Sequence, residues 1–217
     1  RILKKFSNIK TIDIVEINPG YRDVMENYPD NYKIYNDKNI KIHYEDGRRH
    51  LKKDNQKYDF ILMNTTWHWR SNITNLLSLE FLNICKKHLN PGGVIYYNTT
   101  FSKDVSRTTA EAFKYVTFFG NFIAGSDYPF NMTREQRYRA LQEFYNDDGS
   151  RYFESSEALK KWRAKLLAHE IIDIRKELIA DQTLNVITDN NMFSEYKNMR
   201  SYFDPKKSWE IVINNLQ

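Results

Sequence analysis

The stretch that decides the fold is Phe60-Ile61-Leu62-Met63, which runs directly into Asn64-Thr65-Thr66-Trp67-His68-Trp69-Arg70. A short apolar run of this kind is typical of a buried strand, and polar, aromatic and basic groups gather where that strand ends. In an open parallel sheet, ligands bind in the crevice beyond the carboxyl ends of the strands. The segment from Asn64 to Arg70 is therefore a candidate active-site loop, although two tryptophans in a loop also serve simply as a lid over a core.

Similar strands recur along the first half of the chain. The residue pattern predicts strands over residues 11–17, 40–44, 58–63 and 94–98, and an amphipathic helix over residues 75–89. That helix is expected to stop at Asn90-Pro91-Gly92-Gly93, where a glycine provides the positive φ of a helix-to-strand turn. Short strands separated by helices indicate an α/β fold with a parallel sheet and helices on both faces.

Polar side chains stand at or just past the carboxyl end of each predicted strand: Glu16, Asp46, Asn64 and Asn98. On one rim of a sheet they would form a small-molecule site. A carboxylate such as Glu16 accepts hydrogen bonds from both hydroxyls of a ribose, and Asp46 accepts from the exocyclic amine of a purine. Each also has a structural interpretation, because Asp46-Gly47 is a common turn and Asn64 suits a helix cap.

Composition indicates one domain with room for a small appendage. The chain has 217 residues, with 33 lysines and arginines against 28 aspartates and glutamates. Both signs are interspersed, which is typical of a solvated surface and gives only weak support for nucleic-acid binding. The single cysteine, Cys85, lies at helical spacing from Leu77, Phe81 and Leu89, which favours a buried structural thiol in a reducing compartment.

No apolar run approaches the roughly eighteen residues that a membrane-spanning helix needs, and no signal peptide is visible. The chain begins at Arg1 without a methionine, so we expect a piece of a longer protein. We expect a cytoplasmic location, either for a free protein or for the cytoplasmic domain of a protein with an upstream membrane segment.

The second half of the chain is expected to be mainly helical. The pattern predicts a helix over residues 103–113, a sheet-closing antiparallel hairpin of residues 115–119 and 121–124, a helix opened by the capping box Thr133-Arg134-Glu135-Gln136, and a strand over residues 184–187. A long amphipathic helix from Ser155 carries an apolar stripe that is either core packing or an oligomer face: Leu159, Trp162, Leu166, Leu167, Ile171, Ile174 and Leu178.

This pattern predicts two domains, a nucleoside-binding domain of residues 1–130 and a mainly helical extension of residues 131–217 packed on it. His169-Glu170 has no second histidine four residues on, so no zinc motif and no metal ligand are assigned.

Four motifs follow one another in order: Val15-Glu16-Ile17-Asn18-Pro19, Glu45-Asp46-Gly47-Arg48-Arg49, Tyr58-Asp59-Phe60-Ile61 and Leu89-Asn90-Pro91-Gly92-Gly93-Val94. Their order and spacing resemble the spermidine synthase family, a branch of the class I S-adenosylmethionine-dependent transferase superfamily. The segments 64–70 and 75–81 also resemble uncharacterised bacterial spermidine-synthase-like domains, which occur in proteins with membrane-spanning segments.

The resemblance implies a Rossmann-like class I methyltransferase fold with a closing hairpin and a helical C-terminal extension. It also implies a site for S-adenosylmethionine or decarboxylated S-adenosylmethionine. In such a site Glu16 binds the ribose, Asp46 with Gly47 binds the adenine, and Asn64 faces the cofactor and the acceptor.

The sequence departs from the family in two ways. The family's first strand and its glycine-rich loop precede the segment where this chain begins, and no Gly-x-Gly occurs here. That strand is central in the family's sheet, so its absence is expected to leave two strand edges unpaired. In addition, polyamine-forming members carry a catalytic aspartate where this chain has Asn64.

The second departure bears on the chemistry. In aminopropyl transfer a neutral amine attacks the carbon next to a sulfonium, and an aliphatic amine is almost wholly protonated at pH 7. Asn64 cannot accept the proton. His68 is the nearest residue that can, since an unperturbed histidine has a pKa of about 6.5. Asn64 and His68 are therefore the candidate catalytic residues.

The remaining candidates concern the substrate. Trp67 and Trp69 suit cation–π contact with a sulfonium or an amine. Arg70 suits an anionic group, unless it pairs with Glu80 on the following helix, which we favour. The resemblance adds Asp189, because a comparable acidic turn lies near the site in related domains.

We therefore expect a spermidine synthase-like transferase that forms a homo-oligomer and acts on a small-molecule acceptor such as an amine. Methyl transfer is favoured over aminopropyl transfer, because a methyl acceptor need not be a protonated amine. A non-catalytic nucleoside-sensing or regulatory domain of a larger, membrane-attached protein is the alternative. A nucleic-acid methyltransferase is a third hypothesis, which steeply salt-dependent binding to RNA would support.

Overall fold

A computed structural model of the chain describes residues 2–28, 32–64 and 73–191. The chain divides into two compact units. The first combines Arg1–Lys53 with Asn131–Glu170, and the second combines Asp54–Phe130 with Ile171–Gln217. These two units differ from the two domains predicted from the sequence, which meet at residue 130. Whether the predicted domains fold separately stays a prediction.

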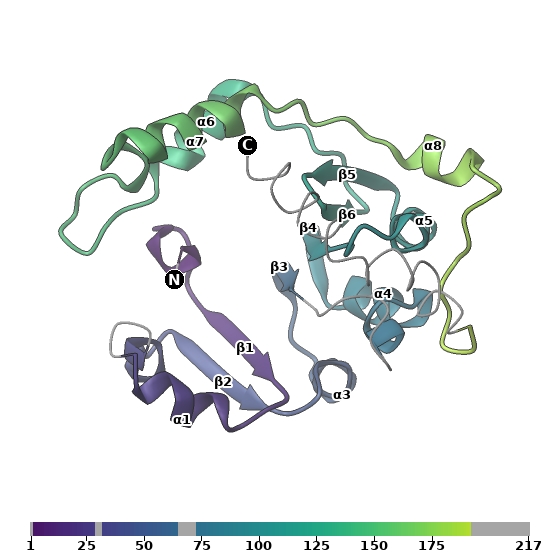
Figure 1. Cartoon of the computed structure of the whole chain (residues 1–217), viewed down its shortest axis with the longest axis horizontal. Helices are drawn as coiled ribbons and strands as arrows, with labels where there is room; N and C mark the ends of the chain where they lie inside the picture. The colour runs from purple at the N-terminus through teal and green to yellow at the C-terminus, as the bar shows by residue number, and fades with distance from the viewer. Residues whose placement is uncertain (1, 29–31, 65–72, 192–217) are drawn as a thin grey trace, which may run out of the picture. The chain divides into compact units, whose positions relative to one another are not determined.

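The first unit contains a two-stranded parallel sheet. Strand β1 (Ile12–Glu16) pairs with β2 (Ile40–Tyr44) in a register that runs from Ile12 opposite Ile40 to Glu16 opposite Tyr44 (Figure 1). Between them lie α1 (Tyr21–Glu26) and the 3-10 turn η2 (Lys33–Asn36). Helix α3 (Gly47–Lys53) follows β2 and packs on β1. Both strands occur where the sequence predicts them.

A helical segment completes the first unit. It consists of α6 (Arg134–Gln142), the 3-10 turn η4 (Tyr152–Glu154) and α7 (Glu157–Ala168). Phe144 in this segment stacks on Phe6, with ring centroids 4.8 Å apart. Phe6 follows the short 3-10 turn η1 (Leu3–Lys5) near the start of the chain. The predicted capping box is confirmed. The Thr133 hydroxyl accepts from the Gln136 amide at 3.1 Å, and the Gln136 side chain accepts from the Thr133 amide at 2.8 Å.

The prediction of one long helix from Ser155 is wrong. Helix α7 ends at Ala168, and a separate helix, α8, spans Arg175–Ala180. Arg137 donates to the carbonyls of Leu166 and His169, so a tertiary contact satisfies the end of α7 where the local pattern shows no stop signal. None of the side chains of α7 is fully buried and Trp162 is 54% exposed, whereas Leu159, Leu166 and Leu167 are half-buried. The choice between core packing and an oligomer face therefore stays a prediction.

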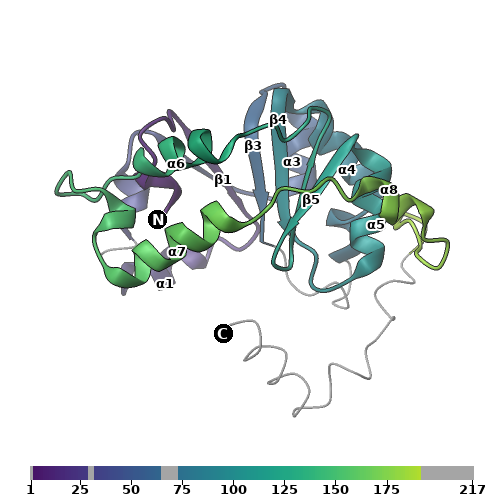
Figure 2. The ribbon, with the colours of Figure 1, turned by 90° about the horizontal axis from the view of Figure 1, so that it is seen from above.

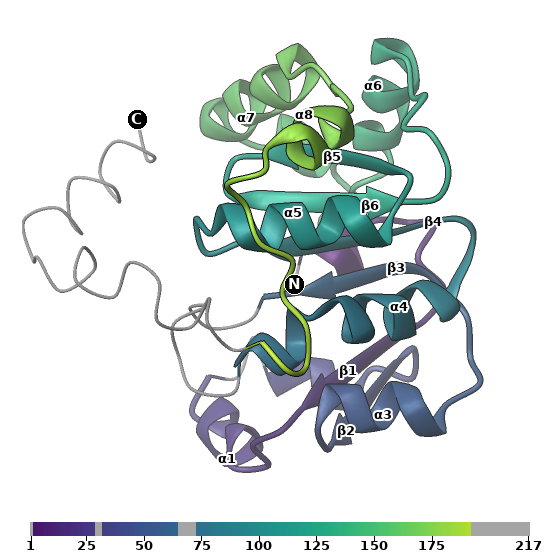
Figure 3. The same cartoon turned by 90° about the vertical axis from the view of Figure 1, so that its right-hand side faces the viewer.

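The second unit is built on a four-stranded sheet in the order β3 (Tyr58–Met63), β4 (Leu89–Asn98), β6 (Phe122–Ser126) and β5 (Tyr115–Phe119). Strands β3 and β4 are parallel, whereas β6 is antiparallel to both of its neighbours. The predicted closing hairpin is therefore confirmed. Helices α4 (Leu79–Lys87) and α5 (Lys103–Ala112) lie on the same face of this sheet (Figures 2 and 3).

The core of the second unit lies between that sheet face and the two helices. Tyr97 is fully buried, and its hydroxyl shares a 2.5 Å hydrogen bond with Thr109 on α5. Cys85 is fully buried on α4, which confirms the predicted structural thiol. Gly125 on β6 allows a close approach, because a Cβ there would lie 2.7 Å from Cδ2 of Phe113.

Two boundaries in the second unit differ from prediction. The helix expected over residues 75–89 is preceded by the 3-10 turn η3 (Ile73–Leu76), and α4 begins only after Ser78, whose hydroxyl accepts from the Phe81 amide. Strand β4 begins at Leu89 and includes the proline-glycine-glycine segment. Gly92 has the predicted positive φ, 79°.

The strand expected over residues 184–187 is absent from the described part of the chain. The amide of Asn185 donates to the Asp104 carboxylate and that of Ile187 to the Thr108 hydroxyl. Side chains of α5 thus accept hydrogen bonds from the backbone amides that would otherwise have paired with a neighbouring strand.

Each sheet ends on a strand that has a single neighbour within the described residues, β1 in the first unit and β3 in the second. Strands β2 and β5 at the other ends of the two sheets also have one neighbour each, so the expectation of two unpaired edges stays a prediction. Among the same residues, no helix is long and apolar enough to cross a membrane.

The tight packing at Gly125 gives a test of the fold. Gly125→Ala should destabilise the protein by about 1–3 kcal/mol, because the added methyl group overlaps the Phe113 ring. Chemical denaturation followed by circular dichroism measures the loss. In a Phe113→Leu background the same substitution should cost less, since the overlapping ring is gone; an equal cost in both backgrounds would contradict this packing.

Candidate functional site

The first unit places Glu16 and Asp46 at the carboxyl ends of neighbouring strands. Glu16 is the last residue of β1 and lies opposite Tyr44, the last residue of β2. Asp46 follows two residues later and directly precedes α3, which begins at Gly47. Because β1 and β2 are parallel, the predicted ribose-binding and adenine-binding residues are on the same edge of this sheet, as expected.

Glu16 is half-buried and stabilises its own turn. Its Oε1 atom accepts from the amide of Asn18 at 2.8 Å, and the Asn18 side chain accepts in turn from the amide of Gly20 at 3.0 Å. These two bonds fix how the chain leaves β1. The contact leaves the acceptor chemistry of the carboxylate intact, because an ionised carboxylate has about four acceptor positions.

Asp46 caps helix α3. Its Oδ1 atom accepts from the amide of Arg49 at 2.8 Å, and its carbonyl accepts from the amide of His50 at 2.8 Å. Asp46 thus has a structural role, but as a helix cap and not in the Asp46-Gly47 turn that the sequence suggested, since Gly47 is already helical. Asp46 is exposed. A helix cap and an adenine contact are compatible roles, since the cap uses one of the two oxygens.

The second unit places Asn64 and Asn98 in the same way. Met63 lies opposite Tyr97 in the parallel pair β3 and β4, so the two asparagines follow neighbouring strand ends. Asn64 is exposed. Asn98 is held in place, because its Oδ1 atom accepts from the Thr100 amide and from the Asn121 side chain, both at 2.8 Å.

The turn after Asn98 has an unusual backbone. Thr100 and Phe101 have φ angles of 51° and 62°, a left-handed region that side chains other than glycine and asparagine rarely adopt. Such conformations concentrate at functional sites, where the surrounding structure holds them. No residue pattern predicted this turn, because strain of this kind depends on the contacts around it.

Asp189 lies at the amino end of α4. It accepts a 2.6 Å hydrogen bond from the Ser78 hydroxyl, and its amide donates to Glu80 at 3.0 Å. Asp189 belongs to the same unit as Asn64 and Asn98. These hydrogen bonds connect the chain near residue 189 to the start of α4, which gives Asp189 a structural role.

Four predicted residues lie outside the described part of the chain: Trp67, His68, Trp69 and Arg70. Their catalytic and substrate-binding roles stay predictions. The pairing of Arg70 with Glu80 likewise stays a prediction, although Glu80 accepts from the amide of Asp189.

A pocket of about 330 Å³ opens at the amino end of β4. Its lining includes Lys57, Lys86, Asn90, Asp127 and Tyr128. It therefore lies at the opposite end of β4 from Asn98, and it is not the predicted site.

A third group of polar residues lies at the end of β2 and on α3, and no residue pattern predicted a role for it: His43, Glu45 and His50. Two histidines and a glutamate within eight residues could have drawn attention to it. The signal is weak, because only the packing of α3 beside β2 brings a strand residue and a helix residue together.

The comparisons with known proteins agree with this arrangement. The model of the spermine/spermidine synthase domain matches residues 1–120. A polyamine aminopropyltransferase of Lachnoclostridium phytofermentans is 27% identical over 120 residues, which cover 54% of this chain and 42% of that protein. Another, of Alkaliphilus oremlandii, is 27% identical over 114 residues, covering 49% and 40%. The match thus spans well under half the length of these relatives.

A solved structure supports the fold independently. Spermidine synthase from Thermotoga maritima matches 76% of this chain and 63% of its own, with a TM-score of 0.52 and 17% identity. At this identity the likeness shows a common fold, the Rossmann-like class I methyltransferase fold. Together with the family match over more than half of its residues, it shows that this chain belongs to the spermine/spermidine synthase domain family.

Proposed function

We propose that the chain binds a nucleoside of the S-adenosylmethionine class and transfers a group from its sulfonium to a small amine. The observation that carries the proposal is the position of Glu16 and Asp46 at the carboxyl ends of two neighbouring parallel strands, within the part of the chain that matches the family. Crevices at such strand ends are where open α/β sheets bind nucleotides.

The residues fit the nucleoside half of this ligand. A cis-diol needs two acceptors, which the Glu16 carboxylate supplies, and an exocyclic amine needs one, which the exposed Asp46 carboxylate supplies. The turn bonds of both residues hold them at the strand ends before any ligand arrives. Such preorganisation lowers the entropy cost of binding.

Two observations favour different transferred groups. The names of the relatives, polyamine aminopropyltransferases, support aminopropyl transfer. Asn64 supports methyl transfer to an acceptor that is not an alkylammonium, because an asparagine cannot take the proton of an alkylammonium. In either reaction a neutral nucleophilic atom of the acceptor attacks a carbon bonded to the sulfonium, the carbon–sulfur bond breaks, and its electron pair remains on sulfur. An alkylammonium acceptor must lose a proton before this attack, and we propose His68 as the residue that takes it.

The alternative function is a nucleoside-sensing domain that binds the same ligand without turnover. Asn64 also favours this alternative, because it stands where polyamine-forming members of the family carry a catalytic aspartate. A cytoplasmic location, attachment to a membrane segment and assembly of copies also remain proposals about the larger protein.

The role of Glu16 can be tested with a substitution that keeps its turn. Glu16→Gln retains an oxygen for the Asn18 amide but replaces the second acceptor with a donor that faces the ribose hydroxyls. We expect affinity for methylthioadenosine to fall by about 10-fold or more, because a hydrogen bond to a charged group contributes about 1.5–3 kcal/mol. Calorimetric titration with methylthioadenosine, S-adenosylmethionine and its decarboxylated form measures this.

Asp23→Asn is the matched control, since Asp23 is an exposed carboxylate on α1 in the same unit. Its affinities should equal those of the unmodified chain. Unchanged binding by Glu16→Gln would remove Glu16 from the site. Failure of the folded, unmodified chain to bind any of the three ligands would overturn the proposed function.

Asn64→Asp tests which group is transferred. With decarboxylated S-adenosylmethionine and putrescine, restoring a carboxylate should raise the formation of methylthioadenosine by about 100-fold or more, the usual scale of general base catalysis. Mass spectrometry separates methylthioadenosine from decarboxylated S-adenosylhomocysteine, the product that methyl transfer from the same donor would leave. Asn98→Asp makes the same change at the next strand end and should produce no such rise. An equal rise in both variants would show that Asn64 has no special position.

A further inference from the structure

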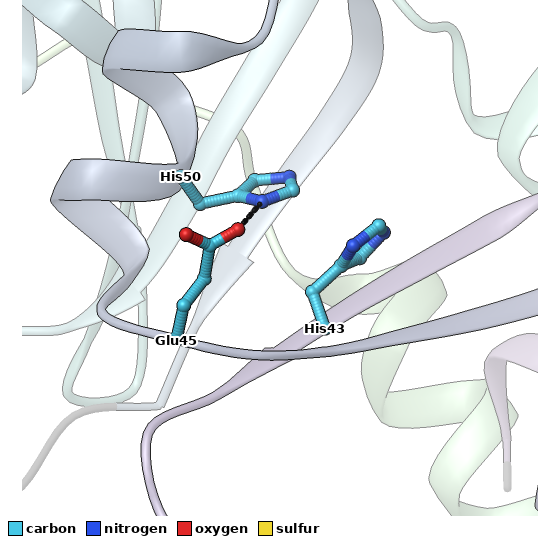
Figure 4. A group of neighbouring side chains, drawn as sticks. All are labelled: His43, Glu45 and His50. Atoms are coloured by element: carbon cyan, nitrogen blue, oxygen red, sulfur yellow. Dashed lines mark hydrogen bonds and ion pairs between the residues drawn. The ribbon is translucent and has the colours of Figure 1, made fainter.

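Three side chains that can bind metal ions converge at the end of β2. His43 lies on β2, Glu45 follows the strand, and His50 lies on α3. One possible ligand atom from each lies within 4.8 Å of the other two. Figure 4 shows the Glu45 carboxylate meeting the His50 ring, with the His43 ring rising beside them from β2.

The contacts of Glu45 direct one oxygen into this group. Its Oε1 atom lies 2.9 Å from Nδ1 of His50, whereas its Oε2 atom lies 3.6 Å from the ammonium of Lys53. The hydrogen bond with His50, and then the charge of Lys53, lower the pKa of the Glu45 carboxyl below its usual value. The carboxylate thus directs its Oε1 atom at the histidines and its Oε2 atom at Lys53.

The strand next to β2 orients the second histidine. Oδ1 of Asp13, a side chain on β1 that is only 8% exposed, lies 3.4 Å from Nε2 of His43. A carboxylate at one ring nitrogen fixes the imidazole with its proton on that nitrogen and its lone pair on the other. In His43 the nitrogen left to bind a ligand is then Nδ1. In His50 the Nδ1 atom already bonds to Glu45, so an ion bound between these two atoms would displace the proton that they share.

The two imidazoles lie close enough to bind the same cation. Their ring centroids lie 4.5 Å apart at an interplanar angle of 48°. Imidazole nitrogens are common metal ligands, and two rings at this spacing can bind one ion. His50 is buried while the side chains of His43 and Glu45 are 34% and 29% exposed, so the group has a fixed inner side and an accessible outer side.

We propose that His43, Glu45 and His50 bind one divalent transition-metal ion, for which zinc is the best match, and that Asp13 positions His43. Imidazole nitrogens and a carboxylate oxygen are donors that zinc accepts. Zinc–ligand bonds of about 2.0–2.2 Å in a tetrahedron place the ligand atoms roughly 3.4 Å apart. Small side-chain rotations bring the three atoms from their present separation to that geometry, and a water or an incoming group takes the fourth position.

The ion would connect three elements of the first unit. Glu45 and His50 flank the turn that holds Asp46, and Asp13 connects His43 to β1, the strand that ends in Glu16. Metal binding should therefore stiffen the turn at the strand ends. This inference rests on the geometry of the cluster and holds whether or not the chain transfers a group.

The test is a zinc titration of the untagged full chain after treatment with a chelator. Calorimetry should show one zinc ion bound per chain, and the melting temperature should rise as zinc is added, because a ligand that binds the folded state stabilises it. Cobalt(II) should give the intense visible absorption of a four-coordinate site. Absence of saturable binding by the folded chain would overturn the proposal.

The variants locate the ion. Glu45→Gln and His43→Gln alter partly exposed residues, so the fold should survive, as circular dichroism can verify, while zinc affinity falls at least 10-fold and the cobalt bands disappear. Asp13→Asn should lower zinc affinity by about 10- to 100-fold, the usual effect of altering a residue that orients a ligand. His88→Gln is the matched control, since His88 lies in the other unit and bonds to the Gln56 carbonyl. Binding that persists unchanged in Glu45→Gln and His43→Gln, or that is lost in His88→Gln, would place the ion elsewhere and overturn the proposal.

Discussion

Parallel pairing, of β1 with β2 in the first unit and of β3 with β4 in the second, is the constraint that positions the candidate residues within each unit. A parallel pair brings both carboxyl ends to one edge, so residues that follow different strands become neighbours in space. In this way Glu16 reaches the edge that carries Asp46, and Asn64 reaches the edge that carries Asn98. An antiparallel pair would have sent them to opposite edges.

The polar residues at these edges have local structural roles as well as the proposed functional ones. Glu16 and Asp46 each use one oxygen to accept a backbone amide of the turn that they begin, and Asn98 accepts two donors with its side-chain oxygen. The structural and functional interpretations are therefore compatible. A side chain held by its own turn loses less conformational freedom when it binds a ligand than a mobile one would.

Adjacent carboxylates after β2 have different environments. Asp46 faces the first turn of α3 and caps it, whereas Glu45 lies between His50 and Lys53. The difference follows from the direction of the chain as it turns from a strand into a helix, since neighbouring side chains there leave on different sides. One short turn can therefore serve both the proposed nucleoside site and the proposed metal site.

The sequence by itself determined the local structure of most of the first half, because apolar alternation, glycine and proline act over a few residues. It predicted β2 and β3 to the residue, the capping box at Thr133 and the strand-end positions of Glu16 and Asp46. It also revealed the family, through motifs carried on those turns.

Only the tertiary structure decided the features that depend on distant contacts. The apolar stripe after Ser155 predicted one helix, but Arg137 satisfies the carbonyls at the end of α7 and the chain continues as an extended segment. Residues 184–187 have a strand-like pattern, yet side chains of α5 accept hydrogen bonds from the amides of Asn185 and Ile187. The meeting of His43 with His50 depends on α3 packing beside β2, and the left-handed turn at Thr100 depends on what surrounds it. Apolar periodicity in the sequence indicates which face of a helix or strand is buried. These arrangements depend instead on which distant segment packs against that face.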